Sequence, residues 1–202
     1  MLRTMPCTTT ASKLIKVSFL LLATLGLQAC ITTAVVGTAA VATKVATDPR
    51  TAGTQIDDET LEVRVSSALN KDPEIKEDAR INIISYNTKV LLIGQVPNES
   101  LRETAKNLAS GVDGVTDIYN EIRVGGKIGF GQISTDSWIT TRIKSKLLLN
   151  SAVKSTDVKV VTENGEVFLM GNVTQAQANA AAEDARYVGG VSKVIKVFSY
   201  IN

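Results

Sequence analysis

The sequence predicts an α+β protein that contains two tandem copies of one small domain. Residues from Asp58 onward repeat from Asp136 onward, and Arg64 aligns with Arg142. Within each copy, apolar residues recur every four positions in the first segment and alternate with polar residues in the next, so a helix precedes strands. The repeat is far longer than a solenoid unit, which indicates two separate domains.

Each copy begins with an amphipathic helix. The residues that recur every four positions are Leu61, Val65 and Leu69 in the first copy and Ile139, Ile143 and Leu147 in the second. This spacing places them on one helical face, which we expect to face the core. The acidic residues Asp57, Asp58 and Glu59 are expected to be solvated and to lie at the helix start, where the helix dipole favours them.

A β-hairpin follows the first helix in both copies. The turns are predicted at Asn87 in the first copy and at Asn164-Gly165 in the second. Apolar positions flank each turn with strand-like spacing. They are Ile81, Ile83, Val90, Leu92 and Val96 in the first copy and Val158, Val160, Val167, Leu169 and Val173 in the second.

A second helix and a final strand complete each copy. Asn98 is the predicted N-cap in the first domain, and Thr174 with Gln177 three residues later forms a capping-box pattern in the second. The stretches VDGV (112–115) and VGGV (188–191) end these helices, and we expect glycine to supply a left-handed cap there.

The first 29 residues have the layout of a secretory signal. Three basic residues precede the apolar run 17–27, which as a helix would span about 16 Å, roughly half a bilayer core. The sequence LQAC at its end resembles the lipobox of bacterial lipoproteins. This resemblance implies that Cys30 becomes the first mature residue and carries a diacylglycerol and an N-acyl chain, with no other cofactor. Ile31 after it implies sorting to the outer membrane.

An uncleaved membrane anchor is the alternative interpretation of this region. Residues 17–43 carry no charge and are long enough to span a bilayer. However, Gln28 and the Thr, Gly and Ala residues from Thr32 onward make the second half a poor hydrocarbon segment. The two interpretations agree that the rest of the chain is tethered to a membrane.

The domain boundaries follow from these patterns. Residues 1–29 form the signal peptide, and residues 30–56 comprise the lipidated Cys30 and a flexible linker without clear period. The first domain covers residues 57–124 and the second covers 134–202. Between them, residues 125–133 (GGKIGFGQI) form an interdomain linker.

Two motifs, each present in both copies, carry a family resemblance. They are the glycine after the second strand, in LLIGQV and FLMGNV, and the VDGV or VGGV turn before the third. With the αββαβ order, they resemble the BON domain, a bacterial periplasmic module, across nearly all of residues 57–202. The resemblance implies a three-stranded mixed sheet packed against two helices. Together with the lipobox it resembles the dual-BON lipoproteins, which implies an outer-membrane lipoprotein that faces the periplasm.

The only tryptophan in the chain lies on the first helix of the second copy. Its face is opposite the predicted core face, together with Leu148 and Leu149. The first copy has Thr60, Asn70 and Lys71 at these three positions, so the fold does not require apolar residues there. An exposed apolar patch usually marks an interaction site.

Basic residues flank this patch, and tryptophan beside cations suits the headgroup level of an anionic bilayer. The family resemblance also implies that this helix binds phospholipid. The expected lipid-binding residues are Trp138, Thr141, Arg142, Lys144, Ser145, Lys146, Leu148 and Leu149, with Phe130 and Ile128 of the preceding loop extending the surface. The alternative is that Trp138 packs against the first domain.

Several functional classes are disfavoured by composition. The chain has no histidine, and no P-loop, dinucleotide fingerprint or serine elbow is present, so we expect no enzyme, no catalytic residue and no metal site. Loss of residues 1–29 removes three positive charges and turns the formal net charge from +2 to −1, so no nucleic-acid partner is expected.

Two functions remain. The first is an outer-membrane lipoprotein that binds an anionic phospholipid membrane, supports outer-membrane integrity and, by the family resemblance, acts at cell division sites. The second is a periplasmic protein-interaction adaptor for outer-membrane assembly or peptidoglycan-remodelling machinery, which would engage its partner through the acidic first domain.

Overall fold

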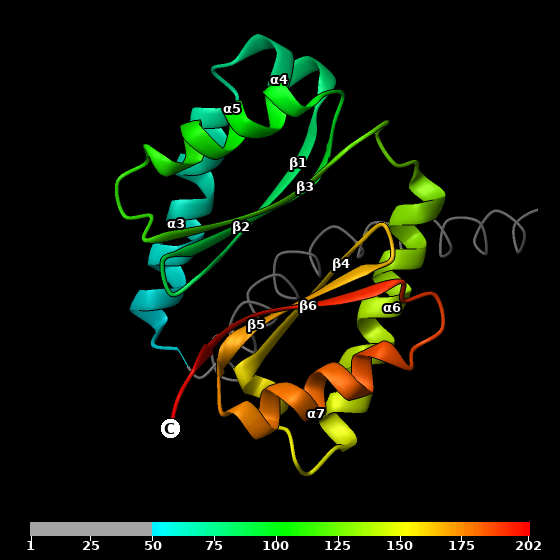
Figure 1. Ribbon diagram of the computed structural model, residues 1–202. Helices are drawn as coiled ribbons and strands as arrows, with labels where there is room; N and C mark the ends of the chain where they lie inside the picture. Colours follow the sequence, from blue (N-terminus) through cyan, green and yellow to red (C-terminus); the bar gives the residue numbers. More distant parts are fainter. Residues whose placement is uncertain (1–49) are drawn as a thin grey trace, which may run out of the picture. The chain divides into compact units, whose positions relative to one another are not determined.

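The computed structural model describes residues 50–202 (Figure 1). The signal sequence, Cys30 and most of the expected linker lie outside the described residues. The described part confirms the α+β class, with two domains that each contain a three-stranded sheet. Among residues 50–202, no helix combines the length and apolar character needed to cross a bilayer.

The first domain contains three helices and one mixed sheet. Strand β1 pairs antiparallel with β2, and β2 pairs parallel with β3, in the order β1-β2-β3. The elements are α3 (Ala52–Leu69), α4 (Pro73–Asp78), β1 (Arg80–Tyr86), β2 (Lys89–Val96), α5 (Glu99–Ser110) and β3 (Asp117–Val124).

The second domain repeats this topology. Strand β4 pairs antiparallel with β5, and β5 pairs parallel with β6. In Figure 1, α6 and α7 cover one face of this sheet, as α3 and α5 cover one face of the first. The elements are α6 (Phe130–Leu149), a 3-10 turn (Ser155–Asp157), β4 (Val158–Glu163), β5 (Glu166–Val173), α7 (Gln175–Arg186) and β6 (Lys193–Tyr200).

Both first helices begin earlier than the sequence pattern predicts. Helix α3 starts at Ala52, because the Thr51 hydroxyl caps it by accepting from the Thr54 N–H at 3.1 Å. Residues 52–56, expected in a flexible linker, are therefore helical. Helix α6 starts at Phe130, inside the expected interdomain linker. Helix α4 and the 3-10 turn are additions to the predicted αββαβ order.

The predicted turns and caps are mostly confirmed. Asn87 and Asn164 have positive φ angles of 50°, as a tight hairpin requires. Asn98 and Thr174 cap their helices as predicted, Thr174 with a full capping box. The left-handed glycines occur in the predicted stretches, at Gly114 of VDGV and Gly190 of VGGV. They lie in the turn after each helix, whereas the C-cap residues are Gly111 and Tyr187.

A buried aspartate on each first helix holds the hairpin turn of its own domain. The Asp136 carboxylate accepts from the backbone N–H groups of Asn164 at 2.7 Å and Gly165 at 2.9 Å. Asp58 accepts from Asn87 at 2.8 Å and Thr88 at 2.9 Å. The expectation that Asp58 is solvated at a helix start is wrong, because α3 begins six residues earlier and the carboxylate is 2% exposed.

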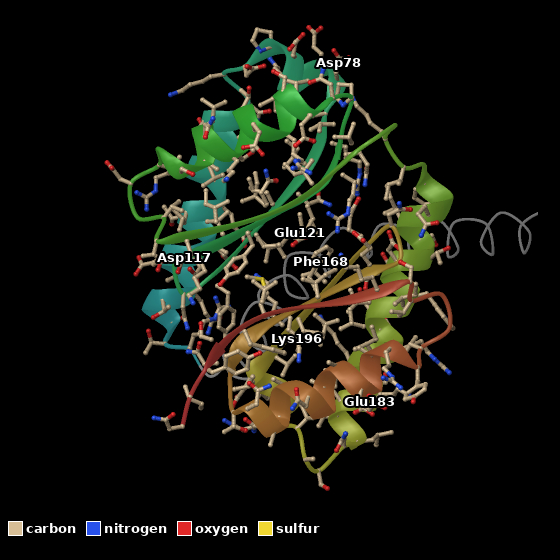
Figure 2. All side chains as sticks on the ribbon, in the orientation of Figure 1. Asp78, Asp117, Glu121, Phe168, Glu183 and Lys196 are labelled. Atoms are coloured by element: carbon tan, nitrogen blue, oxygen red, sulfur yellow. The ribbon has the colours of Figure 1, made fainter. Side chains whose placement is uncertain are left out.

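Each domain has its own core between helices and sheet, and a third apolar cluster joins the opposite faces of the two sheets. Phe168 of β5 lies in this joining cluster and is fully buried (Figure 2). The other buried members are Ile84, Tyr86, Leu91 and Ile93 of the first domain and Met170 and Val197 of the second. Both faces of each sheet are therefore covered.

Polar contacts flank the joining cluster. The buried Glu163 carboxylate accepts from Arg80, from Asn82 at 3.0 Å and from Gln95 at 2.6 Å. Arg123 donates to both carboxylate oxygens of Glu166, at 2.8 and 3.1 Å. Hydrogen bonding to Glu166 is the main reason that the pKa of Arg123 is raised, although partial desolvation acts to lower this pKa. These contacts fix the register of one domain against the other.

The motif glycines Gly94 and Gly171 permit a close strand approach. A Cβ at Gly171 would overlap the Asp157 carbonyl, and the φ of Gly171 is +150°.

We expect Gly171→Ala to lower the free energy of unfolding by about 2–3 kcal/mol. Gly189→Ala is the control, because a Cβ there meets nothing within 4 Å, and it should cost less than about 0.5 kcal/mol. Urea unfolding followed by circular dichroism measures both, and equal losses would contradict the steric explanation.

Candidate functional site

Helix α6 carries a row of exposed apolar side chains on its outer face. We name this row the apolar stripe, and it comprises Phe130, Trp138, Leu148 and Leu149. Trp138 is 53% exposed and Leu149 is 86% exposed. At about 100° per residue, these four side chains fall within an arc of roughly 120° along a helix about 30 Å long. The stripe is long enough to contact an extended surface.

The opposite face of α6 explains why the stripe points outward. Ile139, Ile143 and Leu147 are buried in the core of the second domain. Rotating α6 to bury the stripe would expose this core face. Trp138 is also absent from the cluster that joins the two domains. The structure therefore does not place Trp138 at the domain interface, which was the alternative from the sequence.

Cations border the stripe on both sides. Lys144 and Lys146 project to opposite edges of the arc, and both are exposed. The Arg142 guanidinium lies over the Trp138 ring, 5.4 Å from its centroid, which is a cation–π contact. Lys146 reaches the Asp184 carbonyl only at 3.4 Å, so its ammonium remains available to an anion.

Two polar residues on the same arc as the stripe, Thr141 and Ser145, form hydrogen bonds within the helix. The Thr141 hydroxyl donates to the Ser137 carbonyl at 3.0 Å, and the Ser145 hydroxyl donates to the Thr141 carbonyl at 2.9 Å. Because both hydroxyl groups donate to the preceding turn, Thr141 and Ser145 need no hydrogen-bond acceptor outside the helix. The face can therefore enter a less polar environment at small cost.

The two residues expected to extend the surface behave differently. Phe130, which the sequence pattern placed in a loop, is the first residue of α6 and part of the stripe. Ile128 precedes the helix and is half-buried, and its N–H donates to the Gln95 side chain at 3.3 Å. The structure thus brings Phe130 to the candidate site but ties the Ile128 backbone to the first domain.

A second aromatic–arginine pair, beside α6, was not predicted from the sequence. Tyr187, at the end of α7, is 64% exposed, and its hydroxyl accepts from Arg186 at 2.6 Å. This bond is the main reason that the pKa of Arg186 is raised, with Glu183 contributing. The turn after Tyr187 runs alongside α6 (Figure 1), and a Cβ at Gly190 would lie 3.0 Å from Ile139.

Comparison of the two copies could have found this pair. The first domain has Ser110 and Gly111 where the second has Arg186 and Tyr187. The fold is therefore satisfied without an aromatic residue at this position. Within residues 50–202, no group of three or more His, Cys, Asp or Glu side chains is arranged to hold a metal ion.

The first helix of the first domain lacks the stripe. Thr60 on α3 is aligned with Trp138, and its hydroxyl donates a hydrogen bond to the Ile56 carbonyl at 2.7 Å. Helix α3 does expose Ile56 and Val63, but neither is aromatic, and the exposed Asp57 lies beside them. Only the second copy combines exposed aromatic residues with flanking cations.

Comparison with known proteins gives consistent matches. The model of the BON domain family matches residues 57–126 and 135–202. The chain is 60% identical over 193 residues to the outer membrane lipoprotein DolP of Haemophilus influenzae, covering 96% of this chain and 100% of that protein. It is 68% identical over 154 residues to the 21 kDa hemolysin of Actinobacillus pleuropneumoniae, covering 76% and 79%.

More distant matches follow. Osmotically-inducible protein Y of Escherichia coli is 34% identical over 148 residues, with 70% of this chain and 72% of that protein covered. Among solved structures, the C-terminal domain of CdsD, a structural protein of the type III secretion system of Chlamydia trachomatis, matches with 12% identity and a TM-score of 0.30. That match covers 70% of this chain and 98% of the CdsD chain.

Proposed function

Because this chain belongs to the BON-domain family, we propose that its second domain binds anionic phospholipid membranes through the apolar stripe of α6. The chain is an outer-membrane lipoprotein, like the Haemophilus relative that it matches over nearly its whole length. Its lipidation at Cys30 and its position facing the periplasm are part of the proposal. A role in outer-membrane integrity and at cell division sites is also part of the proposal.

One observation carries the proposal. Two copies of the same fold lie in one chain, and only the second exposes an aromatic stripe between cations. Since the first copy folds with polar residues at three of these four positions, stability alone does not account for the stripe. Indole rings prefer the interfacial level of a bilayer, and long basic side chains reach anionic headgroups. A membrane surface supplies both environments at once.

The expected affinity is modest but sufficient. Full burial of one large apolar side chain is worth about 1.5–3 kcal/mol, so partial insertion of Trp138, Leu148 and Leu149 gives roughly 3–5 kcal/mol. Each cation near an anionic surface adds about 1 kcal/mol. A lipid anchor at Cys30 would raise the local concentration to around millimolar. Weak docking by α6 is then enough to hold the second domain against the bilayer.

Vesicle flotation tests this proposal. The fragment 48–202 contains every described element and all three apolar clusters, so it is suitable without the lipid anchor. We expect it to float with vesicles that contain phosphatidylglycerol, to float less as salt rises, and to remain unbound with pure phosphatidylcholine. Trp138→Glu should abolish flotation, because a carboxylate opposes both insertion and the anionic surface.

The matched control is Val63→Glu on α3, which places the same charge at an exposed apolar position of the first domain. It should leave flotation unchanged. Both variants should keep the thermal stability of the parent. Flotation of Trp138→Glu at the parental level would refute the proposal, and a large loss of stability in that variant would assign Trp138 a packing role instead.

Association with outer-membrane assembly or division proteins is a further proposal from the resemblance. The acidic first domain is the part expected to engage such partners, but the acidic residues near the start of α3 offer less free charge than the sequence indicates. Asp58 is buried, and Glu62 pairs with Lys159 at 3.5 Å and accepts from the Ser85 N–H at 2.7 Å. The start of α3 is therefore a poor candidate for a protein-binding surface.

A further inference from the structure

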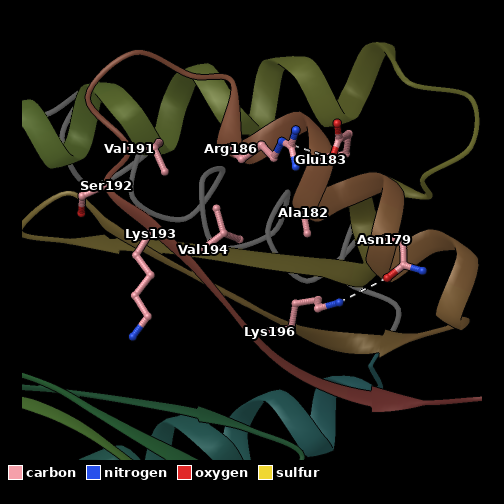
Figure 3. Close-up of a pocket in the computed structure, with 9 residues that line it drawn as sticks. All are labelled: Asn179, Ala182, Glu183, Arg186, Val191, Ser192, Lys193, Val194 and Lys196. Atoms are coloured by element: carbon pink, nitrogen blue, oxygen red, sulfur yellow. Dashed lines mark hydrogen bonds and ion pairs between the residues drawn. The ribbon is translucent and has the colours of Figure 1, made fainter.

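A groove of about 510 Å³ lies between α7 and the last strand, β6 (Figure 3). Its helical wall consists of Asn179, Ala182, Glu183 and Arg186. These residues are spaced three and four apart, so they form one continuous face of α7. The strand side is formed by residues 191–194 and Lys196.

The strand side is an open sheet edge. Among the described residues, β6 pairs with β5 on one side only. Residues 191 and 192 precede β6, whereas Lys193, Val194 and Lys196 belong to it; Lys193 points to one face of the sheet and the other two point to the opposite face, yet all three line the groove. The groove therefore follows the edge of β6. Such an edge presents unpaired backbone N–H and C=O groups, which can accept another strand.

The groove is basic in the second domain alone. Three cations line it, against one carboxylate, and they are Arg186, Lys193 and Lys196. The aligned residues of the first domain are Ser110, Asp117 and Asn120, which carry no positive charge. Lys193 makes no hydrogen bond or ion pair within residues 50–202. Lys196 makes one weak contact across the groove, from its Nζ to Asn179 at 3.2 Å (Figure 3).

We infer that this groove binds an extended acidic peptide segment of a partner protein, which adds to β6 as a fourth strand. Strand addition requires an open sheet edge, where backbone bonds supply affinity, and the neighbouring wall of α7 can select side chains. Side chains on one face of such a peptide meet Ala182, Val191, Val194 and Lys196, and those on the other face meet Lys193.

A synthetic peptide tests the inference on the full chain in a mild detergent. The probe is a blocked ten-residue peptide of alternating glutamate and valine, followed by fluorescence anisotropy. We expect saturable binding that weakens with salt and falls at least about tenfold in the double variant Lys193→Glu/Lys196→Glu. Amide hydrogen exchange of β6 should slow on binding. A probe with two central prolines should bind poorly, because proline lacks the N–H.

Matched controls separate the groove from other sites. Lys106→Glu alters the aligned wall of the first domain and should leave peptide affinity unchanged. Trp138→Glu should also leave it unchanged, while removing vesicle flotation, so the two proposals can fail independently. Three results overturn the inference: equal binding by the double variant, binding without protection of β6 amides, or loss of vesicle flotation but not of peptide binding in the double variant.

Discussion

Replacement of Phe168 by alanine should lower the free energy of unfolding by about 3–5 kcal/mol. Phe168 is fully buried in the apolar cluster that joins the two sheets, so its truncation opens a cavity between the domains. Urea unfolding can be followed by circular dichroism for both domains and by tryptophan fluorescence for the second, since Trp138 is the only tryptophan. If the two domains no longer unfold together, the unfolding transitions reported by the two probes should have different urea midpoints.

Phe130→Ala is the matched control for this experiment. It removes the same side chain from a position that is 84% exposed, so the cost should stay below about 0.5 kcal/mol. A loss of less than about 1 kcal/mol for Phe168→Ala would contradict the joining cluster as a source of stability. Coincident transitions would show that the polar contacts of Glu163 and Arg123 still couple the domains.

The largest functional loss is expected when the stripe receives the residues of the first domain. The triple variant Trp138→Thr, Leu148→Asn and Leu149→Lys removes three apolar groups without adding negative charge. Loss of roughly 3–5 kcal/mol of insertion, offset by about 1 kcal/mol from the new lysine, predicts a fall in vesicle affinity of roughly a hundredfold. Vesicle partitioning of fragment 48–202 measures it.

Stability measurements provide the control for the triple variant. All three positions are exposed, and the first domain folds with these residue types at the aligned positions, so unfolding should shift by less than about 1 kcal/mol. Unchanged partitioning would mean that the cations alone bind the vesicle and that the stripe has another purpose. A fall confined to high salt would instead mean that the stripe contributes to binding once salt screens the cations.

The topology of each domain was predictable because its signals are local. Helical spacing of Leu61, Val65 and Leu69, and turn residues such as Asn164, are enough to place helices and hairpins. The start of α3 has a local cap at Thr51, but the residue before this cap is held by tertiary contacts. Arg50 pairs with Asp58 and lies 4.4 Å from the Tyr86 ring centroid. No pattern along the chain could indicate these contacts.

The candidate site was predictable to the extent that it lies on one helix. Trp138 and Leu149 share a face by spacing alone, and comparison of the two copies marks them as unnecessary for the fold. Tyr187 lies in a turn, where no periodicity assigns a face. The basic groove depends on which edge of the sheet stays open, and that is known only once β6 is paired.

Asp58 is a residue that the sequence predicted to be solvated and that the structure buries. Three acidic residues in a row, 57–59, are usually solvated, and the sequence offers no reason to separate the middle one. Its burial follows from the hairpin turn, whose N–H groups need an acceptor. The same residue type at Asp136 of the second copy is the sequence signal that could have revealed this role.

The cluster around Phe168 also has a consequence for biogenesis. Neither half of the chain can shield both sides of its own sheet, so a product truncated after the first copy would display Ile84, Leu91 and Ile93 to water. During synthesis and export, the first domain exposes these apolar residues to water until the second domain packs against it. Clipped or prematurely terminated chains should therefore aggregate or be degraded.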